Sequence, residues 1–305
     1  MDFSVLLTYA GTILKKEQIK TDELMSKHTS FQIGGPAGIF LEIRTEEELE
    51  AMIRYMSREE IPFFVLGKGS NVLVSDDGIK AVILSLGGEF CGISIEGNKL
   101  KAGAAASLEE ISGKAMENGL AGLEFAARIP GSLGGGMVMN AGAYGGEMSQ
   151  VVTRACAMTR KGERLILEKE QMKLGYRSSI FKEEQYIVLW AEMELEEDDP
   201  KEILSKMNDY NEQRSQKQPL EYPSAGSTFK RPQGYFAGKL IMDAGLRGFR
   251  VGGAQVSEKH CGFVINRENA TAADVKRLMA EVQKQVREQF GVELEPEVIF
   301  LGEES

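Results

Sequence analysis

The chain has 305 residues, with 36 basic and 46 acidic side chains and a net charge of −10. This excess of acid argues against broad binding to nucleic acid or anionic membranes, because both partners need a basic face. A chain of this length buries roughly 75% of its unfolded surface, so a large core is available. Cys91, Cys156 and Cys261 are widely spaced and are expected to be buried, and only two histidines are present. The sequence therefore favours a reducing compartment and excludes a disulfide framework and a multi-histidine metal centre.

The N-terminal sequence lacks the basic region and cleavage site of a secretory signal, and no apolar run is long enough to span a membrane. We therefore expect a cytoplasmic enzyme. Residues 1–28 predict a helical segment. A β-α-β pattern follows over 29–92, in which Thr45 and Glu48 predict the start of a helix. Apolar runs predict strands at 38–43, 63–66, 72–74 and 81–84, and the strand at 63–66 is expected to be buried.

This strand ends in a loop made of Gly67, Lys68, Gly69, Ser70 and Asn71. Glycines permit positive φ and let backbone N–H groups converge on an anion. The spacing matches neither a P-loop nor the dinucleotide fingerprint. By itself, the loop is as consistent with a plain tight turn as with a phosphate site.

A second pattern of strands and helices covers residues 93–200. A strand ends near Gly103, and Ser107 with Glu110 predicts a capping box at the start of a helix. Seven glycines lie within residues 131–146, interleaved with apolar side chains, which favours close approach of the backbone to a large ligand over a flexible linker. Strands are expected near 151–159, 163–168 and 186–196, followed by an exposed acidic loop at 196–200.

The remaining residues, 201–305, predict a third region. Its clearest helix covers 272–290, with Thr271 as N-cap and Gly291 as the C-terminal stop. The other expected elements are a helix at 203–213, a loop at 214–238, a short helix from Leu240, strands at 251–254 and 262–265, and a last strand at 292–301.

Nine motifs occur in order along the chain: FQIGGPA (31–37), GKGSN (67–71), GLEFAARIPGSLGG (122–135), MNAGAYGG (139–146), GYRSSIF (175–181), PSAGSTFKRP (223–232), AGKLI (237–241), AQVSEKHCGFVIN (254–266) and EPEV (295–298). Over about residues 28–300 the chain resembles the UDP-N-acetylenolpyruvoylglucosamine reductase family of peptidoglycan synthesis. The resemblance implies an α+β fold. A FAD-binding region of the PCMH (vanillyl-alcohol-oxidase) type would cover 29–200, in subdomains 29–92 and 93–200, and a C-terminal α/β substrate-binding domain would cover 201–305.

The resemblance also implies chemistry. NADPH would reduce non-covalently bound FAD, and an enolpyruvyl sugar nucleotide would then take its place and be reduced to UDP-N-acetylmuramate, in ping-pong order. Hydride would add at C3 and a proton at C2. Arg177 would bind the substrate carboxylate, Glu297 would assist it, and Ser227 would donate the proton. Without the resemblance, a surface ion pair, an exposed strand glutamate and a turn serine would be the better interpretations of these residues.

Further residues are implied in binding. Lys217, Lys230 and Gln255 are candidates for the substrate diphosphate or sugar, and His28 and His260 are expected to be structural. No nucleic acid, membrane or metal partner is expected, and the protein is expected to be a monomer. The cofactor candidates are Gly67, Lys68, Gly69, Ser70, Asn71, Pro130, Gly131, Ser132, Gly134, Gly135, Asn140, Ala141 and Gly142.

The chain departs from the family pattern at Arg128 and Arg231. The connection from Phe181 to Ile187 is short, which predicts the subclass without a tyrosine-bearing lid. Two alternatives stay open. A flavin oxidase of a hydroxy acid or sugar would share the fold, and a non-enzymatic nucleotide-binding module would keep the glycine loops but lose Arg177, Ser227 and Glu297.

Overall fold

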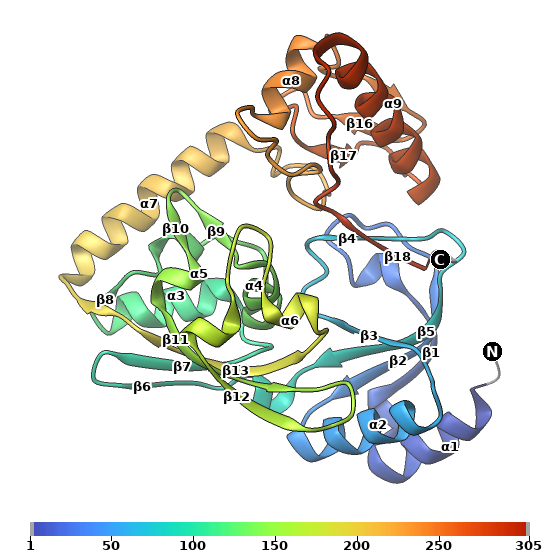
Figure 1. Ribbon diagram of the computed structural model, residues 1–305, viewed down its shortest axis with the longest axis vertical. Helices are drawn as coiled ribbons and strands as arrows, with labels where there is room; N and C mark the ends of the chain where they lie inside the picture. The colour runs from blue at the N-terminus through green and yellow to red at the C-terminus, as the bar shows by residue number, and fades with distance from the viewer. Residues whose placement is uncertain (1–2, 303–305) are drawn as a thin grey trace. The chain divides into compact units, whose positions relative to one another are not determined.

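The computed structural model describes residues 3–302 (Figure 1). The chain divides into two compact units. The first consists of Met1–Thr21, Ile39–Lys68 and Ala81–Gln213, and the second of Asp22–Gly38, Gly69–Lys80 and Arg214–Ser305. The second unit therefore takes two segments from the first third of the chain. Residues 1–2 and 303–305, which fall in the predicted N-terminal segment and C-terminal domain, lie outside the described residues.

The first sheet has the strand order β1-β2-β5-β3, and β3 runs parallel to β5. Helices α1 and α2 cover one face (Figure 1), where Leu49, Met52, Ile53 and Met56 are fully buried with side chains of β2 and β5. Thr45 caps α2 by accepting from the Glu48 N–H, as predicted. The elements are α1 (Ser4–Ile13), β1 (Ile19–Leu24), β2 (Pro36–Ile43), α2 (Glu46–Arg58), β3 (Phe63–Leu66) and β5 (Ile79–Leu86).

Two expectations for this region were wrong. The N-terminal segment is not helical throughout, because β1 joins the edge of the sheet and a tertiary pairing overrides the weak local pattern. Strand β3 is not fully buried. Phe64 and Val65 are 40% and 39% exposed, since β3 lies at the other edge of the sheet.

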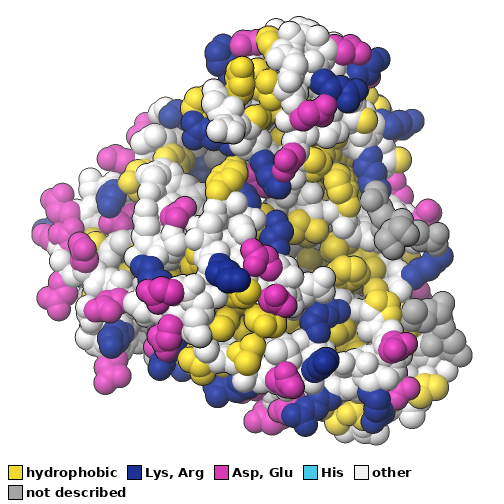
Figure 2. Space-filling view, viewed as in Figure 1, with side chains coloured by type: hydrophobic (Ala, Val, Ile, Leu, Met, Phe, Trp, Pro, Cys, Tyr) yellow, Lys and Arg dark blue, Asp and Glu magenta, His cyan; other side chains and the backbone are white. Residues whose placement is uncertain are grey.

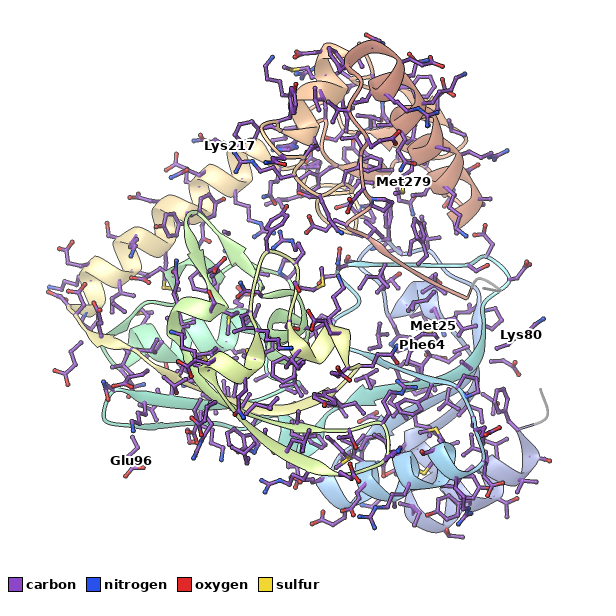
Figure 3. All side chains as sticks on the ribbon, in the orientation of Figure 1. Met25, Phe64, Lys80, Glu96, Lys217 and Met279 are labelled. Atoms are coloured by element: carbon purple, nitrogen blue, oxygen red, sulfur yellow. The ribbon has the colours of Figure 1, made fainter. Side chains whose placement is uncertain are left out.

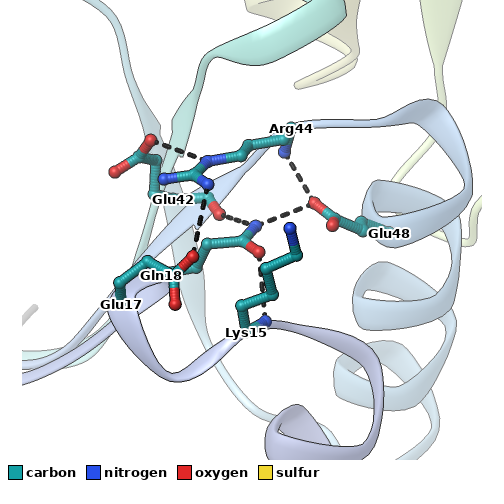
Figure 4. Close-up of polar contacts among 6 residues, drawn as sticks. All are labelled: Lys15, Glu17, Gln18, Glu42, Arg44 and Glu48. Atoms are coloured by element: carbon teal, nitrogen blue, oxygen red, sulfur yellow. Dashed lines mark hydrogen bonds and ion pairs between the residues drawn. The ribbon is translucent and has the colours of Figure 1, made fainter.

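A polar network joins the turn before β1 to this sheet (Figure 4). The Gln18 side chain is fully buried, and its Nε2 donates to the Glu42 carbonyl at 2.7 Å and to Glu48 Oε2 at 3.0 Å. The same Glu48 oxygen accepts from the Arg44 backbone N–H at 2.7 Å. The network thus fixes the entry of α2 against β2.

The second sheet is antiparallel, with the order β12-β11-β13-β7-β6. The predicted strands and the Ser107–Glu110 capping box are confirmed. The acidic run is not entirely a loop, because Glu196–Glu197 (β14) pairs with Leu120–Ala121 (β8). The other elements are β6 (Ile93–Glu96), β7 (Lys99–Gly103), α3 (Leu108–Glu117), α4 (Leu133–Met139), β9 (Gly142–Ala143), β10 (Gly146–Glu147), α5 (Met148–Val151), β11 (Val152–Met158), β12 (Arg164–Glu168), α6 (Ile180–Glu183) and β13 (Ile187–Glu194).

Helix α7 (Pro200–Lys217) begins earlier and ends later than predicted. Within the first unit its Tyr210 ring stacks on Tyr144 of the β9–β10 turn, with centroids 4.6 Å apart and an interplanar angle of 7°. Its Lys206 forms an ion pair at 3.1 Å with Glu124, whose side chain is only 4% exposed. These contacts attach α7 to the β9–β10 turn and to the short 3₁₀ turn at Glu124–Ala126.

In the second unit, α9 packs on the sheet β15-β16-β17. Thr271 is the N-cap of α9 and Gly291 stops the helix at its C-terminus, as predicted. The predicted last strand was too long. It covers only β18 (Ile299–Leu301), which pairs in parallel with β4 (Val72–Val74), and this pairing brings 69–80 into the second unit. The other elements are α8 (Ala237–Asp243), β15 (Arg250–Val251), β16 (Ala254–Val256), β17 (Val264–Asn266) and α9 (Ala272–Phe290).

On the face shown in Figure 2, Lys and Arg side chains are interspersed with Asp and Glu side chains. Within residues 3–302, no helix combines the length and apolar character needed to cross a bilayer. Cys156 and Cys261 are buried, and burial raises the pKa of both thiols. Cys91 is exposed, against the prediction, because it ends a short 3₁₀ turn at Gly88–Cys91.

Candidate active site

The glycine-rich segment folds into a short helix that the sequence did not predict. Ser132, which is 4% exposed, is the N-cap of α4 and accepts from the Gly135 N–H at 3.4 Å. The N–H groups of Leu133 and Gly134 donate to the carbonyl oxygens of Ala106 and Ala104. The first three N–H groups of α4 are therefore already bonded within the protein, so a ligand would approach exposed backbone here rather than free donors.

The glycines of α4 serve different purposes. A Cβ at Gly134 would lie 3.1 Å from Ala104 Cβ, so packing leaves little room for a larger residue there. A Cβ at Gly135 would meet only Ser132 Oγ, at 3.6 Å, and Gly135 is exposed. A Cβ at Gly67 would lie 2.5 Å from Ser132 Oγ, which places the start of the GKGSN loop against the N-cap of α4.

Asn140 ends α4 in the left-handed conformation, with φ 44° and ψ 59°. The residue is 2% exposed, and its Oδ1 accepts from the Ser149 N–H at 2.9 Å, which fixes the orientation of the amide. The Nδ2 group has no hydrogen-bond partner among the described residues. Because a buried donor without a partner costs about 1–3 kcal/mol, this site has the form of one completed by a ligand.

Arg177 lies in a strained turn of the same unit. Its φ is +54°, in the left-handed region that non-glycine residues rarely adopt. Gly175 and Ser178 close the turn with two backbone hydrogen bonds of 3.0 and 3.2 Å, and Lys182 Nζ donates to the Arg177 carbonyl at 3.1 Å. The guanidinium lies 5.2 Å from the centre of the Tyr176 ring, which is 57% exposed. Strain of this kind is concentrated at functional sites.

In the second unit, the segments that carry Ser227 and Glu297 run side by side. Thr228, which is 1% exposed, donates its N–H to the Gly262 carbonyl, and its Oγ1 accepts from the Val264 N–H, both at 2.8 Å. The Glu297 N–H donates to the Thr228 carbonyl at 2.9 Å. The Ser227 hydroxyl has no hydrogen-bond partner within residues 3–302, so it is available to a ligand.

Lys68 of the GKGSN loop lies in the first unit with Gly67, whereas Gly69, Ser70 and Asn71 lie in the second unit. Asn71 Nδ2 donates to the Glu297 carbonyl at 3.2 Å, so this amide holds the glutamate segment. A Cβ at Gly69, where φ is +62°, would lie 2.0 Å from the His28 carbonyl oxygen, so packing requires glycine there. Ser70 is half-buried between them.

The three substrate-binding candidates differ in their surroundings. Lys230 forms an ion pair with Glu295 at 2.8 Å, which lowers the pKa of that carboxyl. Gln255 is 7% exposed and donates to the Gly248 carbonyl at 3.1 Å. Lys217 is the last residue of α7, and its side chain is exposed (Figure 3).

The two histidines have partners within the second unit. His28 Nε2 lies 2.9 Å from Glu23 Oε1. His260 Nδ1 accepts from the Gly262 N–H at 3.1 Å, and burial lowers the pKa of this imidazole. Both arrangements agree with the structural roles expected for these side chains.

Comparison with known proteins identifies the family. The profile of the FAD binding domain matches residues 37–168, and that of the UDP-N-acetylenolpyruvoylglucosamine reductase C-terminal domain matches 218–301. The chain is 50% identical over 304 residues to UDP-N-acetylenolpyruvoylglucosamine reductase of Lachnoclostridium phytofermentans, with 98% of each chain covered. The chain belongs to the UDP-N-acetylenolpyruvoylglucosamine reductase family.

Other relatives agree with this membership. The enzyme of the same name from Caldanaerobacter subterraneus is 50% identical over 299 residues, covering 98% of this chain and 99% of that one. The crystal structure of UDP-N-acetylenolpyruvylglucosamine reductase from Thermus caldophilus has a TM-score of 0.81 at 34% identity, covering 93% of this chain and 98% of that one. The predicted fold, a PCMH-type FAD-binding region with the family's C-terminal domain, is thereby confirmed.

The buried Asn140 amide, whose Nδ2 has no partner among the described residues, and the exposed backbone at Gly135 of the preceding helix fit the FAD that the family binds. Sequence reasoning had included Asn140 among the cofactor candidates but had no signal for the helix before it. It also missed Ser179, which is completely buried and hydrogen-bonds to the Val138 carbonyl of α4 at 2.8 Å. Only the tertiary structure reveals this contact.

Proposed function

We propose that Arg177, Ser227 and Glu297 carry the reduction of an enolpyruvyl sugar nucleotide in this protein. As a member of its family, the chain is a UDP-N-acetylmuramate dehydrogenase, a flavoprotein oxidoreductase of peptidoglycan synthesis that uses FAD and NADPH. The observation that supports the assignment most directly is the pairing of the Ser227 and Glu297 segments through the 2.9 Å hydrogen bond from Glu297 to Thr228.

The cofactor would be held by the backbone around Gly67, by Ser132 and Gly135, and by Asn140, whose Nδ2 would donate to it. Once bound and reduced by NADPH, the flavin would supply the hydride that adds at C3 of the enolpyruvyl group. The other cofactor candidates would line the same site, although packing within the protein already requires glycine at 69 and 142.

Arg177 would bind the enolpyruvyl carboxylate, because a guanidinium can donate two parallel hydrogen bonds to it. Negative charge builds up on this carboxylate as C3 accepts hydride, and a well-placed donor stabilises such a state by roughly 3–4 kcal/mol. The strained turn would hold the guanidinium in place before the charge develops. Glu297 would assist by polarising the same group, and Ser227 would then donate its proton to C2.

The proposal extends to the substrate contacts, the lid and the organisation of the chain. The substrate is a UDP-sugar, and Lys217 would contact its diphosphate, since its exposed ammonium can reach an anion. The short connection from α6 to β13 supports the lidless subclass. The domain boundaries near residues 29, 93 and 201, a cytoplasmic location and a monomeric state complete the proposal.

Sequential mixing tests the proposal. The purified yellow protein should release its flavin with trichloroacetic acid, and NADPH should bleach the flavin absorbance in a stopped-flow instrument. UDP-N-acetylenolpyruvoylglucosamine should then restore the absorbance much faster than oxygen does. Faster recovery with oxygen than with the sugar nucleotide would instead indicate an oxidase of the same fold.

A further inference from the structure

The turn that carries Arg177 is fastened to the C-terminal end of α4 by one buried side chain. Ser179, at 0% exposure, lies two residues after Arg177 and is the N-cap of α6. Its Oγ donates to the Val138 carbonyl at 2.8 Å and accepts from the Lys182 N–H at 3.2 Å. Val138 is in the last turn of α4, where carbonyl groups have no partner within the helix. Ser179 supplies that partner.

The same helix end carries the proposed cofactor contact. Asn140 is two residues after Val138, and the direction of its amide is fixed by the Ser149 N–H. Phe181 of α6 and Met137 of α4 are buried in one apolar cluster. The proposed carboxylate-binding turn and the proposed cofactor amide are therefore joined through one buried hydrogen bond and a shared apolar cluster.

A second contact acts on Arg177 itself. Lys182 Nζ donates to the Arg177 carbonyl at 3.1 Å, across the turn from α6. This bond holds the peptide group after Arg177, whose φ of +54° is unfavourable for a non-glycine residue. Since the backbone conformation at this residue directs its side chain, the bond also constrains the direction of the guanidinium.

We propose that Ser179 and Lys182 are positioning residues for Arg177, which they hold in a strained turn at the end of α4. Neither residue is assigned contact with the substrate. The inference rests on the proposed role of Arg177 in binding the substrate carboxylate. Misplacement of a binding group by about 1 Å can slow catalysis about 100-fold, so the loss of one of two supports should have a clear but smaller effect.

Ser179→Ala is the main test, and Ser112→Ala is its matched control. Ser112 is 1% exposed and donates to the Leu123 carbonyl at 2.8 Å, so both variants lose a buried bond of the same kind. Both should lower the melting temperature. Only Ser179→Ala should slow reoxidation of the reduced flavin by the sugar nucleotide, by about tenfold, and it should leave reduction by NADPH unchanged.

Lys182 gives a second test that does not depend on a buried site. Lys182→Met should slow reoxidation, Lys182→Arg should restore most of the rate, and Lys114→Met on the exposed side of α3 should have no effect. If Ser179→Ala misfolds, these variants still decide the inference. Unchanged reoxidation in both Ser179→Ala and Lys182→Met would overturn it.

The Arg177→Ala background separates the possible failures. If Ser179 acts through Arg177, Ser179→Ala should add no further loss of reoxidation rate in that background. An equal loss in both backgrounds would overturn the positioning role while leaving the proposed function intact. If Arg177→Ala alone leaves reoxidation unchanged, the role of Arg177 in the proposed function is wrong, and this inference falls with it.

Discussion

The backbone N–H of Glu297 donates to the carbonyl oxygen of Thr228 at 2.9 Å. The two segments run antiparallel, and the next pair of residues, Phe229 and Pro296, forms a bridge. The Lys230 N–H then donates to the Glu295 carbonyl at 2.8 Å. The segment before α9 and the segment after it are thus in register. This register brings the segment that carries the proposed acid, Ser227, alongside the segment that carries the proposed polarising carboxylate, Glu297.

Replacing Gly135 by valine should weaken FAD binding without unfolding the protein. The residue is exposed and its Cβ would meet no backbone, so the apoprotein should tolerate the side chain, while a ligand that approaches the backbone should not. We expect FAD affinity to fall at least about tenfold, which corresponds to 1.4 kcal/mol. Flavin absorbance per protein and the apoprotein melting temperature measure the two effects.

Two other glycines provide the comparison. Gly113→Val, on α3 with no atom within 4 Å of its Cβ, should keep full flavin occupancy. Gly134→Val should lower the stability of the apoprotein itself, because the valine side chain would be crowded against Ala104. Full FAD occupancy in Gly135→Val would mean that this glycine has only a structural role in α4.

Asn140→Gly tests the amide without straining the backbone, since glycine adopts positive φ readily. The variant loses the bond from Ser149, but it also loses a buried Nδ2 without a partner, so the apoprotein should change little in stability. The holoprotein should lose the donated bond, worth about 1 kcal/mol, or about fivefold in FAD affinity. Titration of the wild-type and Asn140→Gly apoproteins with FAD would measure this loss of affinity. Asn118→Gly, at the end of α3, is the control. Equal affinities would exclude contact between the amide and the cofactor.

The elements that sequence could predict are those whose signals are local. Thr45, Ser107 and Thr271 each cap a helix through the N–H three residues later, and all three helices begin where these residues predict. Helix α4 was missed because three successive glycines disfavour a helix. It forms because Ser132 caps it, Asn140 ends it, and Leu133 and Met137 are buried.

The site residues show the same division. The motif resemblance indicates Arg177, Ser227 and Glu297 as proposed site residues, whereas the proposed roles of Ser179 and Lys182 follow only from the carbonyl groups that they bind. The last strand was predicted too long because its partner, β4, is more than 200 residues away in sequence and pairs with only three of its residues.

Alanine at Arg177 or Glu297 should separate the two half-reactions. If both residues act on the enolpyruvyl carboxylate, reoxidation by the sugar nucleotide should slow about 10²–10³-fold, while reduction by NADPH should hardly change. Arg164→Ala and Glu293→Ala, which remove exposed residues of the same types, serve as controls. Equal slowing of both half-reactions would show that these residues maintain the flavin or the fold instead.

Acid should destabilise the second unit partly through Asp274. The hydrogen bond from the Thr271 N–H, with those from Arg277 and the Gly253 N–H, lowers the pKa of this carboxyl below its ordinary value. A carboxyl with a lower pKa in the folded state stabilises the fold above its unfolded pKa of about 3.9, and this contribution is lost as the pH falls through the folded pKa.

Asp274→Asn should therefore be less stable than the wild type at pH 7, and the difference should shrink as the pH falls below about 4. Melting temperatures of the apoproteins between pH 7 and the lowest pH at which they stay folded would measure it. Asp209→Asn, on an exposed position of α7, is the control. A difference that stays constant with pH would mean that Asp274 acts through shape and not through charge.

The Ser227 hydroxyl is the proposed proton donor to C2 of the enolpyruvyl group. This hydroxyl has no partner within residues 3–302, while the neighbouring Thr228 is bonded on both sides, so the serine is held by its backbone and its side chain is left for the substrate. A hydroxyl is a weak acid, so it must act late, on a carbon that has become strongly basic. General-acid catalysis contributes about 10²–10⁴-fold, and Ser227→Ala should lose turnover by that order.

The binding of the sugar nucleotide and the reduction by NADPH should both survive in Ser227→Ala, because neither needs the proton. Ser227→Cys should keep part of the activity, since a thiol in the same place can also donate a proton. In deuterated water the wild type should show a solvent isotope effect and should label C2 of the product. If Ser227→Ala turns over at nearly the wild-type rate and labels C2 as before, water or another side chain is the acid, because the hydroxyl that we assign to this step would then be dispensable.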